Sequence, residues 1–336
     1  MGTVELPTGQ EHLVCLGPFD EQELRRLLPQ YSETEISCLN GLTDLRRRAH
    51  DVLATATVVI ASLHKEQCLG EDLLKLMPCC RFIQVPAVGY DSVDIEAAAQ
   101  RGIPVSNLPG FNVDAVADWT VMAILAIVRR AVWGHVRVES GEWPVHQMRS
   151  HDLRALTIGT VGFGRIGQAV ATRLAGFGST IVINDRLDMR DSDAGIEQLS
   201  LLELCRRSHV VSLHVPLTSE TRGMIGADEL AAMPQGSWLV CAGRGGVVEE
   251  VALVDALKRG QLAGAALDVF TAEPLPADSP LRGRADTLLS PHVGGETWEA
   301  FHGLRALLAK NVGRVLRGEF PEYVVNSVGR NRLGTS

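Results

Sequence analysis

Three closely spaced glycines constrain the fold of this chain more than any other feature. Gly162, Gly164 and Gly167 follow an apolar, β-prone run at 157–161 and precede a helical pattern that extends to about residue 177. This spacing permits a tight strand-to-helix turn, lets the backbone approach a pyrophosphate, and lets the helix pack closely on the strand. The free N–H groups and positive dipole at the start of the helix then favour bound phosphates. The feature therefore predicts a dinucleotide-binding βαβ unit.

An acidic residue downstream completes this fingerprint. A second β-prone run at 180–183 leads into Asp185, near the ~20-residue offset at which such an acid is expected. A carboxylate there accepts hydrogen bonds from the ribose hydroxyls and repels a 2′-phosphate, so we expect NAD rather than NADP. The neighbouring Arg186 weakens that preference. The competing interpretation is a structural glycine turn followed by a surface aspartate.

Apolar runs alternate with helical patterns along the whole chain, which predicts parallel sheets covered by helices. Before the glycines, strands are expected at 13–17, 58–61, 82–85 and 104–106; from the glycine unit onward, they are expected at 157–161, 180–183, 209–213, 237–241, 265–268 and 287–290. Long helices are expected over Pro109–Arg130 and Glu296–Arg317. The predicted fold class is α/β, with two doubly wound parallel-sheet domains.

Composition and charge exclude several classes of protein. The formal net charge is −8 and 46% of the residues are hydrophobic, which argues against whole-chain disorder and against a basic nucleic-acid surface. The longest apolar run, near Trp119–Val128, is too short to span a bilayer, and Met1 to Phe19 shows no secretory signal pattern. The seven cysteines lack zinc-site spacing and suit a reducing compartment. We expect a cytoplasmic protein with no metal, membrane or nucleic-acid partner.

Charged side chains closely follow three of the later predicted strands. They are Arg244, Glu273 and His292, and the carboxyl ends of strands in a doubly wound sheet face the ligand crevice. Reduction of a 2-keto acid needs a proton donor, a cation for the carboxylate and a hydride source. Histidine exchanges protons near neutral pH, a carboxylate can orient it, and arginine can bind a carboxylate through two hydrogen bonds. Each residue alone is more typical of a surface or loop position.

Several longer segments resemble those of the D-isomer-specific 2-hydroxyacid dehydrogenases, a family that includes phosphoglycerate, glycerate and D-lactate dehydrogenases. The similar segments are Ala87–Asp94, Gly162–Arg173, His214–Thr221, Gly264–Leu275 and Pro291–His292. They occur in the family's order and cover nearly the whole chain. The resemblance implies hydride transfer between NAD(H) and a small D-2-hydroxy acid or its 2-keto acid.

The resemblance also implies roles for individual residues. His292, paired with Glu273, would be the acid/base, and Arg244 would bind the substrate carboxylate and polarise the carbonyl. The backbone N–H groups of Val88 and Gly89 would hold the same carboxylate. Beyond the three glycines and Asp185, the implied cofactor contacts are Arg165, Ile166, Val215, Pro216, Thr221, Ala242, Asp268 and Gly295. Asp268 would bind the nicotinamide carboxamide.

A discontinuous domain organisation is a further implication of the resemblance. A flavodoxin-like substrate domain of residues 1–107 and 296–336 would be interrupted in sequence by a Rossmann NAD-binding domain of residues 108–295. The two crossings, near Asn107 and Gly295, would act as a hinge. Members of the family commonly form homodimers through the NAD-binding domain, so we expect a homodimer that uses Asp118–Glu142.

The sequence departs from the family pattern at two positions, and two alternative functions stay open. Cys241 stands where the family usually has Asn, and Asp118 stands where it usually has Glu. An arginine-lined site also suits a phosphonate-bearing hydroxy substrate, and the fold alone suits an NAD-responsive corepressor-like binding protein. Neither His64 nor the Trp143–Met148 segment receives a firm role.

Overall fold

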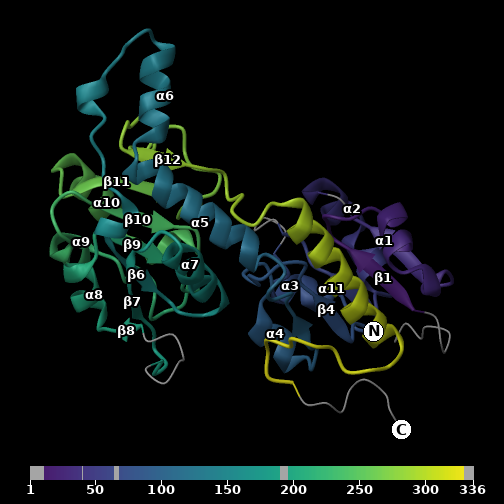
Figure 1. The fold of residues 1–336 in the computed structure, drawn as a ribbon. Coiled ribbons are helices and arrows are strands. Elements are labelled where there is room, and N and C mark those ends of the chain that lie inside the picture. The colour runs from purple at the N-terminus through teal and green to yellow at the C-terminus, as the bar shows by residue number, and fades with distance from the viewer. Residues whose placement is uncertain (1–10, 40, 64–67, 190–195, 329–336) are drawn as a thin grey trace. The chain divides into compact units, whose positions relative to one another are not determined.

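The computed structural model describes residues 11–39, 41–63, 68–189 and 196–328. The chain forms two compact units (Figure 1). The first unit comprises Met1–Asn112 and Trp298–Ser336, and the second comprises Val113–Thr297. The sequence-based domain limits, 107–108 and 295–296, fall a few residues before these crossings, because helices α5 and α11 each begin a unit.

A five-stranded parallel sheet forms the centre of the first unit. Its strands are β1 (His12–Cys15), β2 (Glu35–Cys38), β3 (Val58–Ile60), β4 (Phe82–Gln84) and β5 (Val105–Ser106). Their order, β2-β1-β3-β4-β5, is that of flavodoxin-like folds. Alternating strand residues supply two apolar layers, with Leu13 and Val58 on one face and Val14 and Val59 on the other. Both faces are therefore buried, as a parallel sheet requires.

Helices cover both faces of this sheet. Helices α1 (Glu21–Leu27) and α11 (Trp298–Leu316) pack on one face through Leu24 and Leu308. The other face is covered by α2 (Leu42–Leu53), α3 (Glu71–Lys75) and α4 (Ile95–Gln100). Asp20 begins α1 as the N-cap of a capping box with Glu23, which satisfies backbone N–H groups at the helix start.

A seven-stranded parallel sheet forms the centre of the second unit. Its strands are β6 (Thr157–Val161), β7 (Thr180–Asn184), β8 (Glu197–Gln198), β9 (Val210–Leu213), β10 (Ser237–Cys241), β11 (Leu262–Leu267) and β12 (Thr287–Leu289). The order is β12-β11-β10-β9-β6-β7-β8. The order reverses between β6 and β9, so the carboxyl ends of these two strands flank the position where doubly wound sheets bind ligands.

Helices also cover both faces of the second sheet. Helices α5 (Val113–Val128) and α7 (Arg165–Ala175) pack on one face. The other face is covered by α8 (Leu201–Arg207), α9 (Ala227–Ala232) and α10 (Glu250–Lys258). Helix α6 (Ala131–Glu139) follows α5 and buries none of its residues. The predicted fold class, two doubly wound parallel-sheet domains, is confirmed.

Some sequence-based boundaries were wrong. The helix expected over Pro109–Arg130 begins at Val113, because Gly110 turns the chain with a φ of +94°. Its last expected residue, Arg130, has a φ of 53° and separates α5 from α6. Strands β2 and β8 were not predicted. None of the helices in the described part of the chain combines the length and hydrophobicity needed to cross a membrane.

Candidate active site

The glycine turn joins β6 to α7 in the second unit. Gly162 has a φ of +87°, and a Cβ placed there would lie 2.7 Å from the carbonyl oxygen of His214. A Cβ on Gly167 would lie 2.2 Å from the carbonyl oxygen of Gly162, so the helix packs directly on the turn. A Cβ on Gly164, by contrast, would have no neighbour within 4 Å. The turn therefore leaves open space at the start of α7, which fits the approach of a pyrophosphate.

Asp185, at the carboxyl end of β7, is tied to this turn. Its Oδ2 accepts the N–H of Phe163 at 2.7 Å, and its Oδ1 accepts the N–H of Leu187 at 2.9 Å. Each carboxylate oxygen can accept more than one hydrogen bond. The carboxylate is thus held in position and can still accept the ribose hydroxyls of a dinucleotide.

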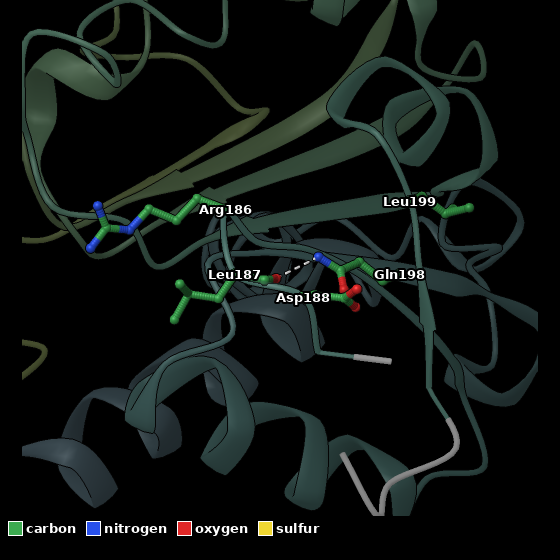
Figure 2. Close-up of a pocket in the computed structure, with 5 residues that line it drawn as sticks. All are labelled: Arg186, Leu187, Asp188, Gln198 and Leu199. Carbon is green, nitrogen blue, oxygen red and sulfur yellow. Dashed lines mark hydrogen bonds between the residues drawn. The ribbon is translucent and has the colours of Figure 1, made fainter. Parts of the chain in front are cut away.

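Gln198 of β8 holds the loop that follows Asp185 (Figure 2). Its side-chain amide donates to the carbonyl oxygens of Asp185 and Leu187 at 3.0 and 2.8 Å, and its Oε1 accepts the N–H of Met189 at 2.7 Å. Nothing in the sequence marks this residue, because a short polar edge strand contains no apolar run. Gln198 therefore fixes the backbone beside the expected ribose position.

A shallow pocket of about 320 Å³ lies beside that loop. It is lined by Arg186, Leu187, Asp188, Gln198 and Leu199. Figure 2 shows the exposed Arg186 side chain extending away from Gln198. The pocket thus carries a cation, Arg186, and an anion, Asp188, beside the loop that follows Asp185.

His292 and Glu273 form a hydrogen-bonded pair. Nδ1 of His292 lies 3.0 Å from Oε2 of Glu273, and the other carboxylate oxygen accepts the N–H of Phe270 at 3.0 Å. The His292 side chain is 47% exposed and that of Glu273 is 24% exposed. The backbone of His292 has a φ of 57°, a region in which non-glycine residues are uncommon and cluster at functional sites. The carboxylate is thus fixed at both oxygens and orients an accessible imidazole.

Asp268 holds the turn that carries His292. Only 1% of Asp268 is exposed. Its Oδ1 accepts the hydroxyl of Ser290 at 2.6 Å and the N–H of Val293 at 2.8 Å, and its Oδ2 accepts the N–H of Gly294 at 2.7 Å. This anchoring was not predicted. An aspartate at the end of a buried strand is nevertheless a signal in the sequence, because a buried carboxylate needs several hydrogen-bond partners.

Arg244 lies in the turn that follows β10. A Cβ on the next residue, Gly245, would lie 2.0 Å from the carbonyl carbon of Phe270, so the Arg244 turn is packed directly against the backbone that leads to Glu273. Cys241 supports the same turn from the interior, since its thiol donates to the carbonyl oxygen of Arg244 at 3.6 Å. Burial raises the pKa of Cys241 to about 11, so the residue that replaces the family's asparagine stays a neutral thiol.

The remaining predicted cofactor residues follow strands of the same sheet or begin α7. Val215, Pro216 and Thr221 lie in the loop after β9, where the Thr221 hydroxyl donates to the carbonyl oxygen of Pro216 at 2.6 Å. Arg165 and Ile166 begin α7, Ala242 follows β10, and Gly295 follows the His292 turn. Because the strands are parallel, the loops after β6, β7, β9, β10, β11 and β12 all leave the same edge of the sheet.

Two sets of predicted residues lie elsewhere. Val88 and Gly89 belong to the first unit, in the loop after β4, where the side chain of Asn107 donates to the carbonyl oxygen of Val88 at 2.7 Å. His64 lies outside the described residues. Within the described ranges, no group of three or more His, Cys, Asp or Glu side chains is arranged to hold a metal ion.

Comparison with known proteins agrees with this geometry. The family model for the NAD-binding domain of D-isomer specific 2-hydroxyacid dehydrogenases matches residues 121–294. The glyoxylate reductase of Thermococcus litoralis is 41% identical over 84% of this chain and 86% of its own length. The D-3-phosphoglycerate dehydrogenase of Methanocaldococcus jannaschii is 33% identical over 96% of this chain and 61% of its own length.

A solved structure extends the likeness to three dimensions. The Aquifex aeolicus D-lactate dehydrogenase, crystallised with NAD and lactic acid, superposes with a TM-score of 0.83 at 28% identity, covering 92% of this chain and 96% of that one. A glycine turn built for a dinucleotide, a matching family model and relatives that span most of the chain lead to one assignment. The chain belongs to the D-isomer-specific 2-hydroxyacid dehydrogenase family and is an NAD-dependent oxidoreductase.

Proposed function

We propose that this protein reduces a small 2-keto acid to the corresponding 2-hydroxy acid, which is the D isomer wherever the product is chiral. Glyoxylate, which gives the achiral glycolate, is the first candidate substrate. The observation that carries the proposal is the His292–Glu273 pair, joined at 3.0 Å on the carboxyl edge of the NAD-binding sheet. The choice of glyoxylate is supported by the glyoxylate reductases that are 38–41% identical to this chain.

In the proposed reaction, bound NADH supplies the hydride that reduces the carbonyl carbon. Nε2 of His292 donates a proton to the carbonyl oxygen, since Nδ1 is held by the carboxylate of Glu273. Arg244 binds the substrate carboxylate and polarises the carbonyl. The backbone N–H groups of Val88 and Gly89 contribute to carboxylate binding, which assigns the first unit to the substrate. In the reverse direction, His292 accepts the proton of the hydroxyl group.

Cofactor contacts follow from the same proposal. The glycine turn and residues Arg165 and Ile166 contact the pyrophosphate, and Asp185 accepts the ribose hydroxyls. Because a 2′-phosphate would approach the Asp185 carboxylate, we expect NADH to bind more tightly than NADPH. The exposed Arg186 limits the size of that preference.

We also infer that the protein forms a homodimer through α6 and the segment after it. Five large apolar side chains there are exposed: Val132, Val136, Val138, Trp143 and Val145. Trp143 alone is 79% exposed. Val132 and Val136 lie one turn apart on the same face of α6. Exposed apolar side chains that gather on one face mark interaction sites in soluble proteins, and a second copy of the chain would cover this one.

Initial rates with a panel of substrates test the proposed activity. The panel contains glyoxylate, hydroxypyruvate, pyruvate, a branched 2-keto acid and a phosphonate analogue, each with NADH and with NADPH. We expect the highest kcat/KM with a small 2-keto acid and NADH. Turnover of the phosphonate analogue alone would favour that alternative substrate class. Tight NADH binding without any turnover would favour a binding protein and contradict the proposal.

A further inference from the structure

Two cysteines of the first unit lie opposite each other on neighbouring strands. In the parallel pair β1 and β2, Cys15 is in register with Cys38, and each is the last residue of its strand. Both side chains contact the same apolar layer, on the face covered by α1 and α11. The proposed reaction uses neither thiol.

The spacing of these residues suits a covalent link. Neighbouring strands lie about 4.8 Å apart, and the Cα atoms of disulfide-bonded cysteines lie about 4.4–6.8 Å apart. The two thiols are direct neighbours, and each shifts the pKa of the other. A disulfide therefore needs side-chain adjustment and no rearrangement of the two strands.

The two thiols titrate as a pair. Contact with Cys38 lowers the pKa of Cys15 most, although burial opposes this, and the same contact together with burial raises the pKa of Cys38. The pair therefore gives up its first proton readily and holds the second, which the two sulfurs share. Since the thiolate is the nucleophile in thiol chemistry, either sulfur of the singly ionised pair can attack.

Other buried cysteines of the chain lack this arrangement. Burial raises the pKa of Cys80 and of Cys205 to about 12, and no neighbouring thiol lowers the pKa of either. Buried thiols of that kind are inert. Cys38, in contrast, is half-buried on β2, which is an edge strand of the sheet. A small oxidant can therefore reach Cys38, and the buried Cys15 lies beside it on the neighbouring strand.

We propose that Cys15 and Cys38 are a modification site that a hydroperoxide converts into a reversible disulfide. The sulfur of Cys38 attacks one peroxide oxygen, the O–O bond breaks, and water leaves with the thiol proton, which gives a sulfenic acid. The Cys15 sulfur then attacks the Cys38 sulfur and displaces hydroxide, which takes up a proton to become water. Two thiols and one hydrogen peroxide thus give one disulfide and two water molecules. A dithiol reductant reverses the change.

Peptide mapping of the oxidised protein tests this proposal. The full-length reduced protein is treated with about one equivalent of hydrogen peroxide, alkylated under denaturing conditions, digested and examined by mass spectrometry. We expect the free thiols to fall from seven by two, and the peptides that carry Cys15 and Cys38 to be joined. Dithiothreitol should restore all the thiols. This arm uses the wild-type chain, so it does not depend on a variant that folds.

Single substitutions provide the controls. Cys38→Ser should abolish the cross-link and Cys15→Ser should leave Cys38 to accumulate as sulfenic acid, which a dimedone probe detects. The matched control, Cys79→Ser, removes another half-buried cysteine and should leave the cross-link unchanged. The proposal is overturned if the wild-type chain keeps all its thiols, if Cys38 is overoxidised without a cross-link, or if the link joins Cys79 to Cys80.

Discussion

Single residues in the second unit act by the space they leave as well as by the groups they carry. Gly245 has no side chain because the backbone of Phe270 occupies the position of a Cβ, and this contact keeps the Arg244 turn beside the Glu273 loop. Gly164 leaves open space at the start of α7. The glycine spacing predicted the turn at Gly162 and the close packing at Gly167, whereas nothing in the sequence predicted the contact at Gly245.

His214, a half-buried residue whose Nδ1 atom is fully enclosed, shows how one side chain links stability to pH. Its Nε2 hydrogen-bonds the hydroxyl of Ser212 at 2.9 Å, while Nδ1 is buried and has no partner within the described parts of the chain. Burial lowers the pKa of His214 from 6.5 to about 4. The imidazole of His214 therefore stays neutral in the folded protein over a pH range in which the same group is protonated in the unfolded chain.

The expected result is a loss of stability in acid. Below about pH 6.5 the imidazole of His214 binds a proton in the unfolded chain, whereas in the folded protein it does so only below about pH 4. The free energy of unfolding should therefore fall between these two pH values by up to about 3 kcal/mol. Urea unfolding of the wild type and of His214→Asn at several pH values measures it. The variant should lose less stability, whereas the exposed control His50→Asn should behave as the wild type. Equal pH slopes for wild type and His214→Asn would contradict this reading of His214.

At the scale of elements, the site is a set of turns at the carboxyl edge of one sheet. The turn from Ser290 to Gly294 is held by Asp268 at the end of β11. Continuous apolar runs predicted β6, β7 and the other buried strands well, because a parallel strand that is buried on both faces is apolar along its whole length. Strands β2 and β8 were missed since they are short, polar edge strands, and in the second of these lies Gln198.

Removal of the Asp268 carboxylate should release the His292 turn. Asp268→Ala leaves the Ser290 hydroxyl and the N–H groups of Val293 and Gly294 without their acceptor. We therefore expect the free energy of unfolding to fall by about 2–4 kcal/mol and kcat to drop strongly. Ser290→Ala removes one donor and should cost only about 1 kcal/mol. Urea unfolding compares the two variants. If both are equally stable, Asp268 does not anchor this turn.

At the scale of the whole molecule, the sequence led to the fold class and family, but not to the surfaces. The order of strands and helices determines a doubly wound topology, so both sheets were predictable in outline. The exposed valines of α6 were assigned to a dimer only by resemblance, because an apolar pattern alone does not distinguish a buried helix from one that a partner covers.

The proposed dimer predicts the effect of a charge placed on α6. Val136 is 54% exposed, and Val136→Asp would place a carboxylate in the interface, where burial of an unpaired charge is costly. Sedimentation equilibrium should then show a dimer for the wild type and a monomer for the variant. The matched control is Val251→Asp, at a valine of α10 that is 79% exposed, and it should stay dimeric. A wild-type monomer, or a dimer that survives Val136→Asp, would argue against this interface.

Single-turnover reduction of glyoxylate tests the central claim most directly. NADH is bound to the wild type and to His292→Asn, glyoxylate is added in excess, and the decay of NADH absorbance is followed, with the NADH Kd measured separately by fluorescence. We predict that the variant loses about 10²–10⁴-fold in rate while its NADH Kd changes less than about twofold. The exposed-histidine control, His50→Asn, should match the wild type. A His292→Asn protein that oxidises NADH at the wild-type rate would show that this imidazole does not deliver the proton.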